Sequence, residues 1–259
     1  MPKLGLSNSL SSSSPYSKFD RWSLAFDGSD DYLDTGEEFK STIADEHSVS
    51  FWIKFADARA SGTKYIIGAK NSSAEDNFYI AITSGGQIKY YIKGNNDSDS
   101  VLASALADGT SAWMHVIVTA SIGEVNGDTG IIYLDGAANT STSLSSISKA
   151  NWNAYDSGQD VYIGSINVNG SSSGEIEANI SDMALYNTVL TPSQVTFIYN
   201  GGAGYNHVRG VASSNLVAWW RMGDGVENAI GTTIYDKSAN SYNGTMTNMA
   251  ADDFEEDTP

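Results

Sequence analysis

The sequence has no cysteine, only three histidines and only four prolines among its 259 residues. Without cysteine the chain cannot form disulfides, thiolate metal sites or a cysteine nucleophile. The histidines, His47, His115 and His207, are too far apart in the sequence to suggest a zinc site. A single unit of this length buries roughly 70–75% of its unfolded surface, so its core needs no covalent crosslink.

Long apolar runs are also missing. No stretch approaches the ~18 apolar residues of a membrane span, so membrane insertion is not expected. The N-terminal stretch MPKLGLSNSLSSSSPYSKF lacks an apolar core of about 7–15 residues. It is therefore not typical of a signal peptide, and we expect synthesis in the cytoplasm without one.

Positive charge is scarce: 14 Lys and Arg face 31 Asp and Glu, for a formal charge of −17. Binding to nucleic acid requires clustered Lys and Arg, so a nucleic-acid partner is not expected. The acidic excess either keeps the protein soluble, for example in a salty medium, or includes carboxylates that hold Ca²⁺.

What the sequence does contain is a regular alternation of apolar and polar residues. Residues 1–20 are Ser-rich with little to bury, which predicts a flexible N-terminal docking arm. From residue 21 onward, stretches of period 2 are separated by Gly, Asn, Asp and Ser, as expected for antiparallel strands. The stretch SVSFWIKF, for example, places Val49, Phe51 and Ile53 on one face.

One short helix is predicted near residues 191–200. Thr191 is a good N-cap, Pro192 suits the first helical position and Gln194 completes a capping box. Gly201–Gly202 would end the helix. Many strands, tight turns and one helix together predict an all-β, two-sheet antiparallel jelly-roll sandwich.

The strands resemble, in their order, the laminin-G-like or concanavalin A-like jelly roll. The resemblance covers about residues 22–200, and we assign residues 21–205 to this sandwich. It rests on the stretches LAFDGSDDYLDTG, SVSFWIKF, WMHVIVTAS, GIIYLDGA and ISDMALYNTVLTPSQV.

The C-terminal segment, residues 206–259, ends in the acidic tail DDFEEDTP. In many domains of this family, stretches like its LVAWW and SANSYNGT come before the opening strand; here they come after the helix. The segment is therefore predicted to complete the sandwich in a circularly permuted order. The alternative is a strand exchange with a neighbouring subunit, which would form a homo-oligomer. Alternation predicts one indole of Trp219 and Trp220 in the core and the other on the outer face.

The resemblance also implies one structural Ca²⁺, bound where the opening turn approaches the closing strand. The matching residues are Asp27, Asp30 and Asp31 on the turn, and Asp182 on the strand. Ca²⁺ takes six to eight oxygen ligands, which carboxylates and turn carbonyls can supply. The alternative is ordinary turn chemistry, in which Asp side chains bond to their own backbone.

No catalytic residues are expected. Related sandwiches that cleave β-glucans carry alternating acids on one strand, and the nearest match here is Glu175 and Glu177. Ile176, Ala178 and Asn179 break that pattern. A Ser-His-Asp triad would need one of the three histidines; His115 lies in a strand of core periodicity, and the other two lie in loop-like sequence.

Glycan binding is another use of the family. The polar loops 71–77, 93–100 and 167–174 could contribute, and Trp152 and Tyr155 could offer a stacking face to a glycan or a partner. These features do not differ from those of ordinary solvated loops.

The Ser-rich arm, the sandwich and the acidic end together resemble surface proteins of tailed-phage particles from aquatic environments. This predicts a non-enzymatic virion structural protein, either a capsid decoration or head appendage, or else a tail or fibre component. It would be made in the host cytoplasm, and its arm would dock on other virion proteins such as capsid, portal or tail. The alternative is a glycan-binding, lectin-like or adhesin module, which would bind a host-surface glycan.

Overall fold

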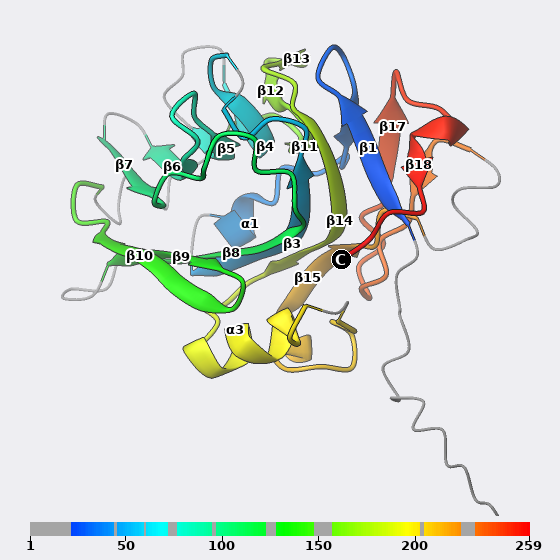
Figure 1. Ribbon diagram of the computed structural model, residues 1–259. Coiled ribbons are helices and arrows are strands. Elements are labelled where there is room, and N and C mark those ends of the chain that lie inside the picture. Colours follow the sequence, from blue (N-terminus) through cyan, green and yellow to red (C-terminus); the bar gives the residue numbers. More distant parts are fainter. Residues whose placement is uncertain are drawn as a thin grey trace, which may run out of the picture.

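Two sheets lie face to face and form a sandwich in the computed structural model (Figure 1). All strand pairings are antiparallel except that of β12 with β4. The predicted all-β sandwich is confirmed. The structure describes residues 22–43, 46–59, 61–71, 77–94, 97–122, 128–147, 157–202, 205–223 and 231–259.

The first sheet has eight strands, seven of them in the order β10-β9-β8-β3-β14-β1-β18, with β15 also paired to β14. Their bounds are β10 (Ala137–Ser143), β9 (Thr129–Leu134), β8 (Met114–Ser121), β3 (His47–Phe55), β14 (Glu177–Tyr186), β1 (Ser23–Asp27), β18 (Phe254–Glu255) and β15 (Leu216–Trp220).

The second sheet has ten strands, eight of them in the order β16-β17-β2-β11-β4-β5-β6-β7, while β12 pairs with β4 and β13. Their bounds are β16 (Thr233–Ile234), β17 (Gly244–Thr247), β2 (Tyr32–Asp34), β11 (Tyr162–Ile163), β4 (Lys64–Lys70), β5 (Asn77–Ile82), β6 (Ile88–Gly94), β7 (Asp97–Leu102), β12 (Ile166–Val168) and β13 (Ser171–Ser173).

The core lies between the sheets and follows the alternation of the strands. Val49, Phe51 and Ile53 of β3 are fully buried, as their spacing predicts. Each fully buried side chain of this kind stabilises the fold by about 1.5–3 kcal/mol relative to an exposed one.

Helix α3 (Pro192–Tyr199) has the predicted cap: the Thr191 hydroxyl accepts from the Gln194 backbone N–H, and the Gln194 side chain accepts from Thr191 N–H. The helix ends at Asn200, whose φ of 49° is left-handed. Val195 and Ile198 pack on the outer face of the first sheet. A one-turn helix, α1 (Lys40–Ile43), was not predicted, because four residues are too few to show an apolar period.

The C-terminal segment pairs with the sandwich of its own chain: β15 with β14, β17 with β2, and β18 with β1. In Figure 1 its red strands accordingly lie beside the blue β1. Trp220 is fully buried in the core, whereas Trp219 lies on the outer face beneath α3. The predicted alternation of the two indoles is therefore confirmed.

None of the helices in the described ranges has the length and apolar character that crossing a bilayer requires.

Candidate functional site

The turn between β1 and β2 gathers three carboxylates. Ligand oxygens of Asp27, Asp30 and Asp31 lie within 4.8 Å of one another. Asp31 is 3% exposed, and its Oδ2 accepts a hydrogen bond of 3.0 Å from the Asp27 backbone N–H. Gly28 makes this turn possible because its φ is 76° and a Cβ there would lie 2.9 Å from the Cβ of Glu177.

The electrostatics of this cluster favour a cation. Burial raises the pKa of Asp31 to about 6, with further increases from the charges of Asp27, Asp253 and Asp30, although the Asp27 N–H opposes them. A divalent cation among these oxygens would relieve the repulsion, and carboxylates are ligands that Ca²⁺ prefers. The donor set of the turn therefore fits Ca²⁺.

Asp182 does not belong to this cluster, which corrects the sequence-based ligand set. Asp27 pairs with Glu177, and Asp182 lies five residues further along β14, about 17 Å by strand rise. A bulge in β14, where Asp182 has a φ of 53°, directs its carboxylate to other partners. It accepts hydrogen bonds from Trp219 Nε1 at 2.5 Å and His207 Nε2 at 3.3 Å.

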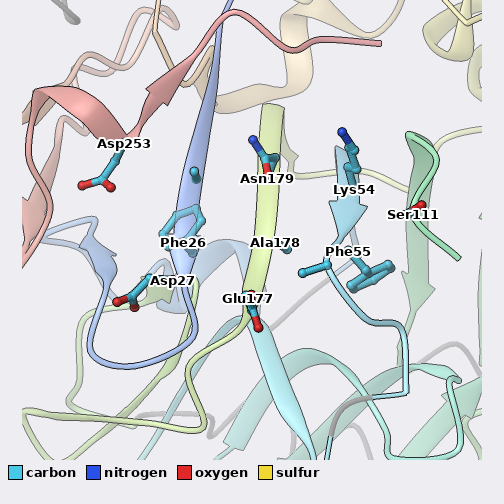
Figure 2. Close-up of a pocket in the computed structure, with 11 residues that line it drawn as sticks. Phe26, Asp27, Lys54, Phe55, Ser111, Glu177, Ala178, Asn179 and Asp253 are labelled. Atoms are coloured by element: carbon cyan, nitrogen blue, oxygen red, sulfur yellow. The ribbon is translucent and has the colours of Figure 1, made fainter. Parts of the chain in front are cut away.

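A pocket of about 310 Å³ opens beside the turn. Figure 2 shows Lys54 and Asn179 next to each other on neighbouring strands, and Asp253 of the C-terminal segment above Asp27. Asp253 was not identified from the sequence, where its only signal was the acidic composition of the tail. The lining consists of Ala25, Phe26, Asp27, Lys54, Phe55, Ala56, Ser111, Glu177, Ala178, Asn179 and Asp253.

Carboxylates of the C-terminal segment accept hydrogen bonds from polar side chains on the outer side of the first sheet. Asp257 accepts from Lys54 Nζ at 2.5 Å and from Trp113 Nε1 at 3.0 Å, and Glu255 accepts from Asn179 at 2.9 Å. Burial raises the pKa of Asp257, but the hydrogen bonds from Lys54 and Trp113 outweigh it and hold that pKa below its usual range. The segment therefore lies across the outer side of the first sheet.

The outer face of the second sheet presents a group of aromatic rings that no pattern in the sequence brings together. We call Tyr65, Tyr79, Tyr91 and Lys89 the tyrosine face. The rings of Tyr79 and Tyr91 stack at 4.8 Å between centroids, and Tyr65 meets Tyr79 edge-on at 5.0 Å. Lys89 Nζ lies 4.8 Å from the Tyr91 centroid. All four side chains are half-buried, so each keeps a solvent-exposed part.

The register of β4, β5 and β6 brings the residues of the tyrosine face together. Tyr79 of β5 pairs with Tyr91 of β6, and Gly68 of β4 pairs with Tyr79 on its other side. Burial raises the pKa of Tyr65 and of Tyr79, so both hydroxyls stay protonated at neutral pH and can donate hydrogen bonds. The outward tyrosines alternate with core residues in each strand, but only the pairing of the three strands shows that they meet.

All three histidines are buried, including His47 and His207, which the sequence placed in loop-like stretches. His115 Nε2 lies 3.1 Å from the Ser50 hydroxyl, and burial lowers the pKa of His115 to about 3. Such an imidazole is a weak base and is only 2% exposed. The Ser50–His115 pair is therefore not suited to nucleophilic catalysis.

The glutamates considered for glycan cleavage do not alternate along a strand. Glu177 is the first residue of β14 and is exposed, while Glu175 precedes the strand. The aromatic residues Trp152 and Tyr155 and the arm 1–20 lie outside the described residues.

The sequence matches the model of the concanavalin A-like lectin/glucanases superfamily over residues 27–196. The chain belongs to this superfamily. A comparison with curated proteins gave no match. The matched region holds the β1–β2 turn, the tyrosine face and the first part of α3.

Solved structures share this superfamily fold. One is a putative carbohydrate binding protein from Bacteroides ovatus, with a TM-score of 0.62 and 17% identity over 92% of this chain; the chain spans 60% of that protein's length. Another is the CBM40 module of a Ruminococcus gnavus IT-sialidase bound to α2,3-sialyllactose, with a TM-score of 0.55, 12% identity and coverage of 68% of this chain and 96% of the module. The same module bound to α2,6-sialyllactose gives a TM-score of 0.53 and 11% identity, covering 68% of this chain and 97% of the module.

Proposed function

We propose that this protein is a non-catalytic carbohydrate-binding module that binds its glycan on the tyrosine face. The observation behind the proposal is that Tyr65, Tyr79 and Tyr91 present adjoining, partly exposed rings on three consecutive strands. Small-ligand sites combine aromatic surface with a few placed polar groups. A tyrosine offers both, because its ring is apolar and its hydroxyl donates a hydrogen bond.

Carbohydrates are the first ligands to test because of the fold. The R. gnavus module was solved with sialyllactose, and the B. ovatus protein is described as carbohydrate-binding. At such low identity the residues that bind a glycan must be argued from this chain alone. A non-catalytic role agrees with the buried His115 and with the position of Glu175 outside β14.

The proposal is tested by substituting one ring of the tyrosine face. We expect Tyr91→Ala to weaken binding about tenfold, equivalent to ~1.4 kcal/mol, because the stacking surface is lost. The measurement is affinity electrophoresis and calorimetry with a panel of neutral and acidic polysaccharides. Thermal unfolding of each variant verifies that it is folded.

Tyr235→Ala is the matched control. Tyr235 is 43% exposed and also lies under a lysine, with Lys237 Nζ 5.2 Å from its ring centroid. It follows β16, at the opposite end of the second sheet from β6. If no polysaccharide of the panel binds, or if the two substitutions weaken binding equally, the proposed function is wrong.

We also propose that the β1–β2 turn binds one structural Ca²⁺ through Asp27, Asp30 and Asp31. The support is the close approach of their oxygens and the raised pKa of Asp31. The ion would hold the three carboxylates together and so make the turn rigid, next to the pocket that Asp27 lines.

The virion role stays a prediction from the sequence. It rests on the arm 1–20, which lies outside the described residues, and on the phage resemblance. A position on a particle surface likewise stays a prediction, and a homo-oligomer formed by strand exchange stays the alternative.

A further inference from the structure

Charge is distributed unevenly over the second sheet. The whole sequence has 31 acidic and 14 basic residues, yet the outward positions of β4, β5, β6 and β7 hold three lysines and no Asp or Glu. The lysines are Lys70 on β4 and Lys89 and Lys93 on β6. A chain of net charge −17 thus presents a locally basic surface, and it coincides with the tyrosine face.

The acids in these strands point away from that surface. Asp97 and Asp99 of β7 pair with Gly94 and with the fully buried Ile92, so they alternate onto the other side of the sheet. Both oxygens of Asp99 also accept backbone hydrogen bonds, from the N–H groups of Ser100 and Ser146 at 2.9 Å. By strand register, these two acids therefore lie on the side of the sheet opposite Lys89.

The adjoining part of the same outer face, over β2 and β11 in the middle of the sheet, is acidic. Asp34 of β2 pairs with Tyr162 of β11. Burial raises the pKa of the nearby Asp160, as do the charges of Asp34, Glu37 and Glu38. An anion on this face is thus repelled from β2 and β11 and attracted towards β6.

Lys89 is placed to act together with the rings. Its Nζ lies 4.8 Å from the Tyr91 centroid and 5.8 Å from the Tyr79 centroid. Cation–π attraction and packing of the aliphatic stem hold the ammonium beside the stacking surface. An ordered cation loses little conformational freedom when a ligand arrives, which favours binding.

We propose that the tyrosine face selects glycans whose sugar rings carry carboxylates, and that Lys89 receives the carboxylate of a ring stacked on Tyr79 or Tyr91. The proposal rests on the proposed function, since it specifies the ligand of the same site. The lysines supply positive charge for the carboxylate, and the three tyrosines supply a stacking surface for the sugar ring. A polyanion without sugar rings would use only the charge.

The test uses polygalacturonate and its fully methyl-esterified form, which have the same backbone and differ in charge. The second pair is sialyllactose and lactose. Calorimetry with the full chain should show at least one acidic form binding about fivefold to tenfold more tightly than its neutral partner in 50 mM NaCl. The preference should shrink in 500 mM NaCl, because salt screens exposed charges.

Variants of Lys89 assign the preference to one residue. Lys89→Gln should weaken binding of the acidic form more than binding of the neutral form, so that most of the preference is lost, and Lys89→Arg should retain the preference. Lys237→Gln is the control, because Lys237 also lies over a tyrosine ring but at the far end of the sheet. It should leave both affinities unchanged.

Each outcome is decisive. If neutral and acidic forms bind equally, or only neutral polysaccharides bind, and Tyr91→Ala weakens that binding, then the charge selection is wrong and the proposed function stands. If dextran sulfate binds as tightly as polygalacturonate and depends equally on Lys89, the surface is a general polyanion site and the carboxylate assignment is overturned. If no saccharide binds at all, both the proposed function and this inference fail.

Discussion

Asp182 illustrates how a single buried charge is stabilised. It is 4% exposed, and His207, Trp219 and the Tyr205 backbone N–H all donate hydrogen bonds to it. Burial raises its pKa, but the charge and hydrogen bond of His207, together with the other donors, hold that pKa below its usual range. Tyr186 extends the network, since its hydroxyl lies 2.5 Å from His207 Nδ1. A buried charge without such partners would be strongly destabilising.

We expect Asp182→Asn to lower the free energy of unfolding by about 3 kcal/mol at pH 7, because His207 and Trp219 lose their charged acceptor. The depressed pKa of folded Asp182 means that its contribution is present above the unfolded value near 4. The contribution is lost as pH falls through the folded pKa. Denaturant unfolding from pH 7 to pH 3 measures both effects.

Asp252→Asn is the control for this substitution, because Asp252 is exposed and should change stability by less than about 0.5 kcal/mol. If Asp182→Asn and the wild type lose stability in parallel between pH 5 and pH 3, Asp182 is not the group responsible.

At the scale of elements, the β1–β2 turn joins three parts of the chain. Gly28 packs against Glu177 of β14, and Asn248 of the C-terminal segment donates a 3.0 Å hydrogen bond to the Asp30 carbonyl. Asp253, from the same segment, adds its negative charge to that around Asp31. The turn is therefore fixed in shape but electrostatically repulsive, a state that a bound cation stabilises.

We expect millimolar Ca²⁺ to raise the melting temperature relative to EGTA, by about 5–10 °C when the ion exceeds its Kd a hundredfold. Asp31→Asn should remove this response, because it removes a buried charged ligand. Differential scanning calorimetry measures the shift, and Asp252→Asn should respond like the wild type. A wild-type melting temperature that EGTA and Ca²⁺ leave equal would rule out the site.

At the scale of the whole molecule, the two ends of the described chain meet. β18 pairs antiparallel with β1, with Ser23 opposite Glu255, so a short turn could join them as a hairpin. Joining these ends would place the C-terminal strands before β1 in the sequence, as in many domains of the family, without moving a strand. This is the geometry that a circularly permuted relative requires.

Consider a permuted chain that starts at residue 205, joins residue 257 to residue 22 through a Gly/Asn-containing turn, and ends at residue 202. We expect this chain to fold. Its melting temperature should lie within about 5 °C of the wild type, because all strand pairs are kept. Light scattering should give a monomer for both chains. A wild-type oligomer that becomes monomeric on permutation would instead favour strand exchange.

Much of the fold could be predicted because its signals are local. The alternation in β3 identifies a strand and its buried face, and Thr191, Pro192 and Gln194 specify the start of α3 by capping. The Asp residues of the β1–β2 turn are also close in sequence, so their proximity followed from the turn. Each of these signals involves residues within a few positions of one another.

The sites that depend on distant residues could not be predicted in this way. The sequence does not show the bulge or the left-handed φ that direct the Asp182 carboxylate away from the turn, and Asp253 reaches the turn only through the pairing of β18 with β1. Tyr65, Tyr79 and Tyr91 meet only because β4, β5 and β6 are neighbours in a particular register.

The sequence by itself determined the class of fold, the capped start of α3, the acidic turn and the absence of thiol chemistry. The tertiary structure alone decided which carboxylates share a site and which rings adjoin. It also left the acids of β7 on the opposite side from the lysines of β6. The physical reason is that backbone alternation and capping act over a few residues, whereas strand order and register are set by packing the whole core.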